Sequence, residues 1–288
     1  MIEVGTVTEL VERTAAQNRA AAQETVTQVD LENLIAQVRA AIKEEPQMTN
    51  HPLPDSISDI SIRAMEEKMA VNYLVSTTSA LIIVDVQNDF VEGGSLAVNG
   101  GRDLAARLAE SLDSGAFELF DHVVTTQDWH IDPGAHFSET PDFVDSWPVH
   151  CVADTDGAKI VPVLADALVR HQVSAAVHKG MFAASYSGFD GFTEDGTTLA
   201  NVLRSLGVES VAVVGIAGDY CVKETALDAR REGFHTVVLD DFTVSIATSP
   251  AQALNTGNPI TSGVVSTMEY VNQRADHHSR QSALNTES

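Results

Sequence analysis

The chain has 288 residues, and 44% of them are hydrophobic, which is enough for one large domain or one domain with an appendage. Its formal net charge of −24 repels nucleic acid and anionic membranes, so we expect neither as a partner. Two cysteines cannot build a disulfide framework, no apolar run is long enough to span a bilayer, and the acidic N-terminus is unlike a signal peptide, so we expect a cytoplasmic protein.

Residues 1–78 are predicted to form a helical N-terminal extension and linker. A helix is expected over 30–45, where Asp30 can cap it and apolar residues recur at helical spacing. The proline-containing stretch 46–56 indicates a linker, and 59–75 fits a further helix. No catalytic constellation lies here. Two interpretations stay open: an appendage for partner docking or homo-oligomerisation, and a loosely held helical extension.

From Ala80 the pattern changes to short apolar runs that alternate with helical stretches. Five buried strands are predicted, at 80–87, 122–128, 175–180, 210–218 and 236–241. Three helices are predicted between them, at 102–112, 197–207 and 221–233, with Gly207 and Gly233 as helix stops. This alternation indicates an α/β fold, a three-layer α/β/α arrangement around a central, mostly parallel sheet. We assign it to 79–272 and expect a disordered polar tail at 273–288.

Three residues that can carry chemistry follow predicted strands. Asp85 closes the first strand, Lys179 the third, and Cys221 begins the helix after the fourth. Because ligands bind at the carboxyl ends of parallel strands, we expect these side chains to meet. A Cys at a helix start has a lowered thiol pKa and free backbone N–H groups beside it. The alternatives are a structural Asp bonded to backbone amides, a Lys reaching the surface, and a Cys that is only a small buried apolar residue.

The segment after the second strand is rich in metal-ligand side chains. Asp128, His130 and His136 lie in one loop, and His150 follows shortly after. A carboxylate and three imidazoles are suitable ligands for one divalent Zn, Fe or Mn ion. The turn at 132–134 can fold His136 back toward His130. An acid, a base and a nucleophile beside a metal can attack an amide carbonyl.

The residues that carry this chemistry resemble those of a known family. The stretches "ALIIVDVQNDFVEGGSLAV", "DWHIDPGAHFSETPDF", "SWPVHCV", "HKGMFAASYSGF" and "VVGIAGDYCVKETALDA" are similar to the nicotinamidase/pyrazinamidase branch of the isochorismatase-like cysteine hydrolases. The resemblance extends from about Ala80 to about Thr248 and is specific, since the metal motif separates this branch from its metal-free relatives. The first 78 residues and those past Ser249 depart from the family pattern.

The resemblance implies a role for each matching residue. Cys221 matches the nucleophile, Asp85 the acid/base and Lys179 the third member of the triad. The metal ligands would be Asp128, His130, His136 and His150. The substrate pocket would be lined by Phe90, Trp147, Tyr186 and Ile216. The Ile216–Ala217 bond matches a cis peptide, and the backbone N–H groups of Ala217 and Cys221 would form the oxyanion hole.

The function implied is hydrolysis of nicotinamide to nicotinate and ammonia through a Cys thioester, with pyrazinamide as a further substrate and a place in NAD salvage. Two other readings remain. In the first, the chain would be a related hydrolase that acts on another amide or carbamoyl substrate; the metal ligands argue against this. Alternatively it is an assembly or binding protein with an idle site, against which the intact triad argues.

Overall fold

The structure, a computed structural model, describes residues 77–247 and 264–265. These residues all belong to the second of two compact units of the chain, Pro54–Ser288. The helices predicted for the N-terminal extension, the linker and the polar tail lie outside the described residues. The division into 1–78, 79–272 and 273–288 therefore stays a prediction.

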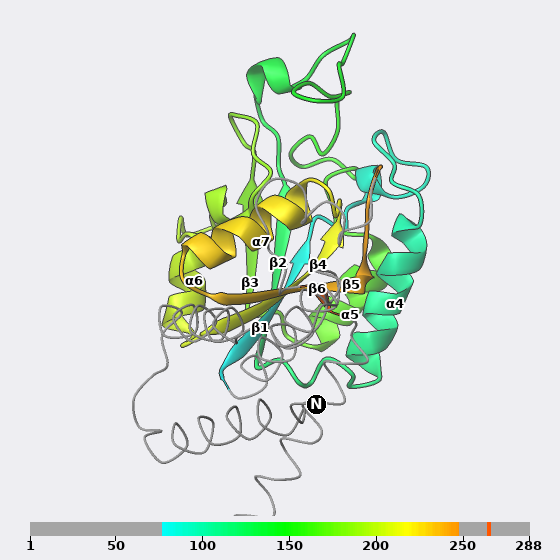
Figure 1. Ribbon diagram of the computed structural model, residues 1–288. Helices are drawn as coiled ribbons and strands as arrows, with labels where there is room; N and C mark the ends of the chain where they lie inside the picture. The colour runs from blue at the N-terminus through cyan, green and yellow to red at the C-terminus, as the bar shows by residue number, and fades with distance from the viewer. Residues whose placement is uncertain (1–76, 248–263, 266–288) are drawn as a thin grey trace, which may run out of the picture. The chain divides into compact units, whose positions relative to one another are not determined.

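Six strands in the described part of the chain form one sheet, and each neighbouring pair is parallel (Figure 1). Across the sheet they are β3 (Ala175–Lys179), β2 (His122–Asp128), β1 (Ser79–Val84), β4 (Ser210–Ile216), β5 (His235–Val244) and β6 (Val264–Val265). The chain runs from β1 outward through β2 and β3 on one side, and then through β4 and β5 on the other. The topological switch point is therefore between β1 and β4, the place where open α/β sheets bind ligands.

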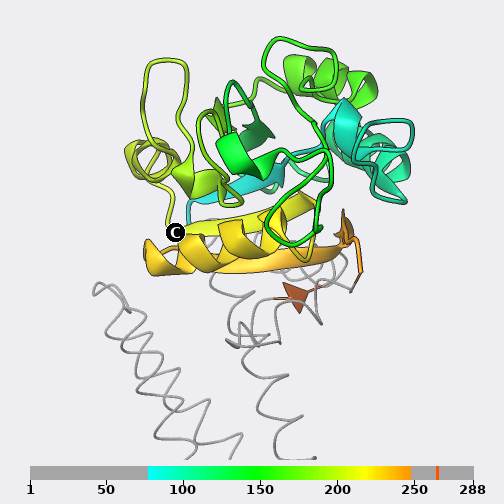
Figure 2. The same ribbon diagram turned by 90° about the horizontal axis from the view of Figure 1, so that it is seen from above.

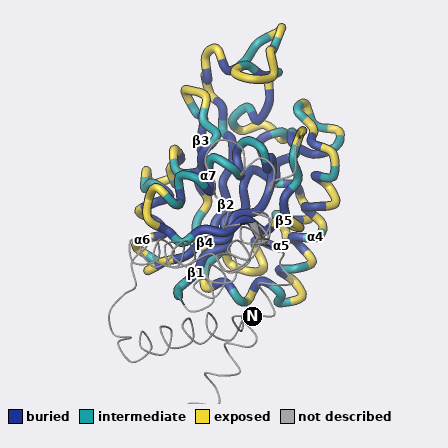
Figure 3. The backbone as a smooth tube through the Cα atoms, in the orientation of Figure 1, coloured by how far each residue is buried: buried dark blue, intermediate teal, exposed yellow. Residues whose placement is uncertain are grey.

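The buried side chains form two cores, one on each face of the sheet. Leu81 and Ile83 of β1 belong to a core with α4 (Gly101–Asp113) and α5 (Pro162–Arg170). Ile82 and Val84 belong to another core with α6 (Leu199–Ser205) and α7 (Cys221–Arg231). The two helix pairs cover opposite faces (Figure 2), and the strands between them are largely buried (Figure 3). This confirms the predicted three-layer α/β/α fold.

The five predicted strands and three predicted helices are present with small shifts at their ends. Gly207 and Gly233 follow α6 and α7 with positive φ angles, as predicted for helix stops. Helix α5 was not predicted. Its sequence begins with Pro162 and contains Val163 and Val169, which are exposed and blur the helical spacing of apolar residues. Three short 3₁₀ turns complete the described structure: η1 (Asn88–Phe90), η2 (Gly134–His136) and η3 (Gly188–Asp190).

One glycine sets the close approach of the two central strands. Gly215 of β4 has a φ of +124°, and a Cβ atom built on it would lie 2.1 Å from the carbonyl oxygen of Val84 in β1. Only glycine fits such a contact without displacing the backbone. β1 and β4 thus meet directly below the residues that leave the sheet at the switch point.

Among the described residues, no helix combines the length and apolar character needed to cross a membrane.

Candidate active site and metal centre

Four of the residues singled out from the sequence leave the sheet at its carboxyl edge. Asp85 follows β1, Asp128 ends β2, Lys179 ends β3, and Cys221 begins α7 just after β4. Asp128 and Lys179 are also register partners across β2 and β3. The parallel sheet therefore brings together side chains that are far apart in the sequence.

Lys179 is a buried cation in contact with all three of the other side chains. Its Nζ lies 2.9 Å from Asp85 Oδ2, 2.5 Å from Asp128 Oδ1 and 3.6 Å from Cys221 Sγ, and it donates to Ser185 O at 3.1 Å. Burial lowers the pKa of Lys179, but the two carboxylates outweigh it and raise that pKa well above its ordinary value. The ammonium therefore stays charged, and it is not a Lys that reaches the surface.

The carboxylate of Asp85 is held at both oxygens. Oδ1 accepts a 2.7 Å hydrogen bond from Thr126 Oγ1, and Oδ2 forms the ion pair with Lys179. Burial raises the pKa of Asp85, whereas Lys179 lowers it. A carboxyl group with a raised pKa at a fixed position is suited to exchange a proton with a neighbouring thiol.

Cys221 has its Sγ within 4.8 Å of ligand oxygens of Asp85 and Asp128. Burial raises the pKa of its thiol well above the ordinary value, the two carboxylates raise it further, and Lys179 lowers it. The lowered thiol pKa expected from the helix start is not found, because burial and the two carboxylates outweigh Lys179. The other cysteine, Cys151, is fully buried in a core, and burial raises the pKa of its thiol too.

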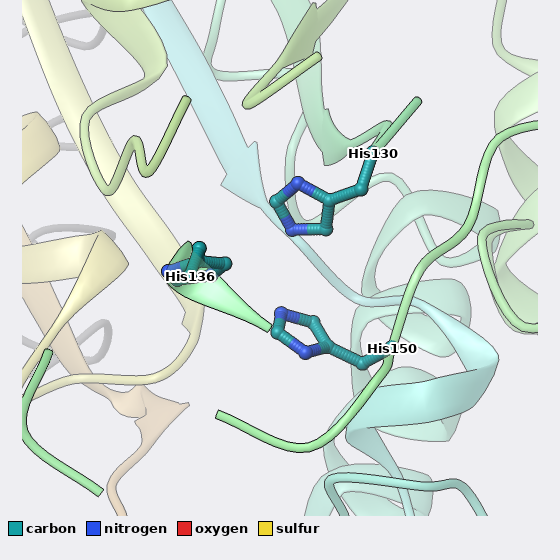
Figure 4. Close-up of side chains that lie close together, drawn as sticks. All are labelled: His130, His136 and His150. Atoms are coloured by element: carbon teal, nitrogen blue, oxygen red, sulfur yellow. The ribbon is translucent and has the colours of Figure 1, made fainter. Parts of the chain in front are cut away.

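Three histidines converge beside this group. His130 follows β2, His136 ends η2 and His150 precedes α5, and their rings surround a common space (Figure 4). One ligand nitrogen from each lies within 4.8 Å of the others. His130 Nδ1 is paired with Gly180 O at 2.6 Å, and His150 Nδ1 with Pro148 O at 2.7 Å. These bonds fix the two rings and leave each Nε2 available as a ligand.

The donor set fits a divalent metal ion. His130 Nε2 and His136 Nδ1 are buried, and the described part of the chain gives neither a hydrogen-bond partner. Burial lowers the pKa of His136 to about 4 and also lowers that of His150, so both imidazoles are neutral, as metal ligands must be. Unpaired, neutral, converging ring nitrogens are what a metal ion would satisfy.

Asp128 joins the histidine cluster to the Lys179 group. Its Oδ2 lies 3.7 Å from His130 Nε2 and 3.9 Å from His150 Nε2, while its Oδ1 pairs with Lys179. Burial raises the pKa of Asp128, but Lys179 and His130 outweigh it and hold that pKa well below its usual range. An ionised carboxylate thus faces both groups at once.

A cavity opens over Cys221, Asp128, His136 and His150. It is lined by the four residues predicted for the substrate pocket, Phe90, Trp147, Tyr186 and Ile216, and also by Leu96, Val98, Asp128, His136, His150, Ser185, Ala217, Tyr220, Cys221 and Ile246. Trp147 Nε1 donates to Tyr186 Oη at 3.0 Å, which locks two of the aromatic walls together. A flat ring can fit between such walls, with one edge toward the histidines and a substituent toward Cys221.

The loop that carries Trp147 is built around Asp142. Its Oδ1 accepts the backbone N–H groups of Val144, Asp145 and Ser146, and these bonds lower the pKa of Asp142. The backbone N–H of Trp147 then donates to His136 O at 2.8 Å. A tight polar turn in the sequence thus holds a pocket wall against a histidine of the cluster.

The peptide bond between Ile216 and Ala217 is cis, as the resemblance implied. Among the described residues, neither the Ala217 nor the Cys221 backbone N–H is paired with an acceptor. Both groups border the cavity beside the Cys221 thiol. Two such donors can stabilise negative charge on a carbonyl oxygen.

Sequence reasoning missed several residues of the site. Gln87 is fully buried and hydrogen-bonds to the backbone of Asp128. The sequence feature that could have indicated it is a polar amide side chain two residues after Asp85, inside the stretch "ALIIVDVQNDF". Tyr220 and Ile246 line the cavity, and Ile246 had no signal because it follows the end of β5 in a stretch without a motif.

The chain matches known proteins over the described domain. The family model "Isochorismatase domain" matches residues 79–269. The nicotinamidase/pyrazinamidase of Mycobacterium tuberculosis is 52% identical over 168 residues, 58% of this chain and 87% of the relative. The nicotinamidase of Escherichia coli is 38% identical over 184 residues, 56% of this chain and 81% of the relative.

Solved structures of nicotinamidases and pyrazinamidases are also similar to this chain. A nicotinamidase/pyrazinamidase of Acinetobacter baumanii aligns with a TM-score of 0.52 and 33% identity over 67% of this chain and 98% of that one. A pyrazinamidase of Pyrococcus horikoshii in complex with zinc aligns with a TM-score of 0.51 and 32% identity over 66% of this chain and 99% of that one. With the family model covering most of its length, the chain belongs to the isochorismatase family.

Proposed function

We propose that this chain is a metal-dependent cysteine amidohydrolase that converts nicotinamide to nicotinate and ammonia, and that it also hydrolyses pyrazinamide. One observation carries the proposal: Cys221, Asp128, His136 and His150 line one aromatic cavity, and Asp128 joins the Asp85–Lys179–Cys221 group to the three histidines. The relatives support it, because the similar proteins are nicotinamidases and pyrazinamidases. The product nicotinate would enter NAD salvage.

The proposed reaction begins with attack of Cys221 Sγ on the amide carbon. Because burial keeps the thiol protonated, its proton passes to Asp85 as the carbon–sulfur bond forms. The N–H groups of Ala217 and Cys221 hold the oxyanion, and the charge of Lys179 stabilises the carboxylate and sulfur around it. Asp85 then gives the proton to the amide nitrogen, which leaves as ammonia, and a thioester remains.

Hydrolysis of the thioester restores the site. Asp85, again a carboxylate, takes a proton from a water molecule as the water oxygen attacks the thioester carbon. The carbon–sulfur bond breaks, Asp85 returns its proton to Cys221 Sγ, and the product is released as nicotinate once its carboxyl proton has passed to solvent. The same carboxyl group therefore acts as a base and then as an acid in each half of the reaction, which its raised pKa and its fixed position beside the thiol support.

We propose that Asp128, His130, His136 and His150 hold the metal ion, which can be Zn, Fe or Mn. When bound, a divalent cation supplies a Lewis acid that can bind a pyridine nitrogen and so position the ring. Phe90, Trp147 and Tyr186 would hold the faces of the ring, and Ile216 its edge. Orienting the carboxamide in this way lowers the entropic cost of the attack on its carbon.

An ammonia-release assay tests the proposal. The metal-loaded wild-type protein should release ammonia from nicotinamide, and Cys221→Ala should not. Cys151→Ala is the matched control and should keep turnover per folded protein. Benzamide, which lacks the ring nitrogen, should be a poor substrate. Hydrolysis of benzamide as fast as that of nicotinamide would mean that the metal does not bind the ring nitrogen. Release of ammonia by Cys221→Ala at the wild-type rate would overturn the mechanism.

Three further predictions remain proposals. The matched family region supports a hydrolase domain at about 79–272. A homo-oligomer formed through residues 1–78 would be seen by comparing the sedimentation of full-length and truncated protein. A cytoplasmic location fits the acidic composition and would be tested by cell fractionation.

A further inference from the structure

We infer that Gln87 is a positioning residue that sets the place of Asp128, and through Asp128 both the metal ligands and Lys179. The inference deepens the proposed function and rests on it for the identity of the metal site. It starts from a side chain that the proposed mechanism does not use, although that side chain is fully buried at the centre of the site.

The side-chain amide of Gln87 forms hydrogen bonds to both the backbone N–H and the backbone C=O of Asp128. Its Oε1 accepts the Asp128 N–H at 2.9 Å, and its Nε2 donates to Asp128 O at 2.8 Å and to Ala158 O at 2.7 Å. The amide orientation is set by these partners, since an N–H can be bound only by the oxygen and the carbonyls only by the nitrogen. Both polar atoms of the amide thus form hydrogen bonds to backbone groups, at Asp128 and at Ala158.

The hydrogen bonds between Gln87 and Asp128 are needed because β1 ends at Val84. The N–H of Asp85 donates to Thr126 O, which continues the pairing of β1 with β2. Two residues further on, Asp128 directs its backbone groups to the same side, but β1 has turned away. A Gln side chain carries the same donor and acceptor as a peptide group, so Gln87 takes the place of the missing strand. Without it, the N–H and C=O of Asp128 would be buried and unpaired.

The position of Asp128 matters to both halves of the site. One oxygen pairs with Lys179, and the other faces His130 and His150. A shift of the Asp128 backbone would move both oxygens together. Loss of the Gln87 amide should therefore weaken metal binding and disturb the Lys179 contact, even though the hydrogen bonds of its side chain go only to the backbone of Asp128 and Ala158.

The chain offers a matched control in Gln127. Its Nε2 donates to the same carbonyl, Ala158 O, at 3.0 Å, and its side chain is also buried. The described contacts of the Gln127 side chain include none to Asp128. Gln87→Met and Gln127→Met thus remove an amide of equal size from neighbouring places, and only the first releases Asp128.

The test measures zinc affinity and turnover of full-length wild type and both variants. Zinc binding is followed by competition with a chromophoric chelator, and folding by circular dichroism and thermal unfolding. Gln87→Met should bind zinc about 10- to 100-fold more weakly, which is typical when an outer partner of a metal ligand is lost. At saturating zinc its kcat should stay low while KM changes less, because Lys179 is still displaced. Gln127→Met should match the wild type in both.

Wild-type zinc affinity and kcat in folded Gln87→Met would overturn the inference and leave Gln87 a purely structural residue. An equal loss in Gln127→Met would overturn it too, by assigning the effect to the Ala158 carbonyl. If Gln87→Met does not fold, Gln87→Asn takes its place with the same expectations, since it keeps the amide but is one methylene too short to reach. Zinc affinity is measured without substrate, so an inactive wild type would overturn the proposed function and not this inference.

Discussion

Lys179 contacts each of the other charged or nucleophilic side chains at the switch point: Asp85, Asp128 and Cys221. Such close charges are strongly coupled because burial removes the solvent that would screen them. A change at one residue is therefore expected to alter the reactivity of the next, and two predictions follow at this scale.

The first concerns the two thiols. Cys221 lines the cavity, whereas Cys151 is fully buried in the core, so iodoacetamide should modify Cys221 first. Because burial raises the pKa of the Cys221 thiol and the thiolate is the reacting form, its alkylation rate should still be rising between neutral pH and about pH 10. Mass spectrometry of peptides at timed intervals measures both. Earlier labelling of Cys151, or a rate that levels off near neutral pH, would contradict the assignment.

The second prediction concerns removal of the metal. The negative charge of Asp128 raises the pKa of the Cys221 thiol, and a bound cation would share that charge. Chelation should therefore abolish nicotinamide hydrolysis and also slow the alkylation of Cys221 at a fixed pH. His136→Ala, which removes one of the proposed ligands, should resemble the chelated wild type. Equal alkylation rates with and without metal would show that the two halves of the site are independent.

Single residues also show how far sequence alone reaches. Asp85, Lys179 and Cys221 could be located because each lies at or shortly after the end of an apolar strand, and parallel strands end at one edge. The pKa of Cys221 could not be predicted, because it depends on burial and on carboxylates that come from other strands. Gln87 was missed for a related reason: its partner, Asp128, is 41 positions away in sequence.

At the scale of elements, the segment after β5 forms a wall of the cavity. The carboxylate of Asp219 accepts the backbone N–H groups of Ile246 at 3.0 Å and Ala247 at 2.8 Å, and Gly218 N donates to Val244 O. The turn that leads into α7 thus holds the end of β5 beside the pocket. The strands and α4, α6 and α7 were predictable from apolar periodicity, but this contact joins two turns and leaves no periodic signal.

The third prediction tests that wall. Ile246 lines the cavity while the residue is 49% exposed, so Ile246→Ala should remove part of an apolar contact with the ring. We expect a loss of about 1 kcal/mol in binding, a rise of about fivefold in KM for nicotinamide, with kcat nearly unchanged. Ile131→Ala, at an exposed residue that does not line the cavity, is the control and should leave KM unchanged. A fall in kcat at constant KM would place Ile246 in the chemistry instead of the wall.

At the scale of the whole molecule, the candidate site belongs to the family domain. Every residue assigned to the triad, the metal ligands or the pocket lies between Asp85 and Ile246, inside the matched range 79–269. The Mycobacterium tuberculosis relative is covered to 87% of its length by a match to only 58% of this chain. Most of the relative's length therefore matches little more than half of this chain, and residues 1–78 lie outside the matched family range.

The fourth prediction follows from that arrangement. Deleting residues 1–75 should leave kcat, KM and zinc content per folded protein unchanged, because both cores of the sheet and all the candidate site residues lie beyond the deletion. Sedimentation of the two forms would show whether the extension changes the oligomeric state, which activity alone does not report. The control is full-length Cys221→Ala, which should have the oligomeric state of the wild type without activity. A truncated protein that is folded and loaded with zinc yet inactive would show that the extension contributes to the site, and the boundary at residue 78 would then be wrong.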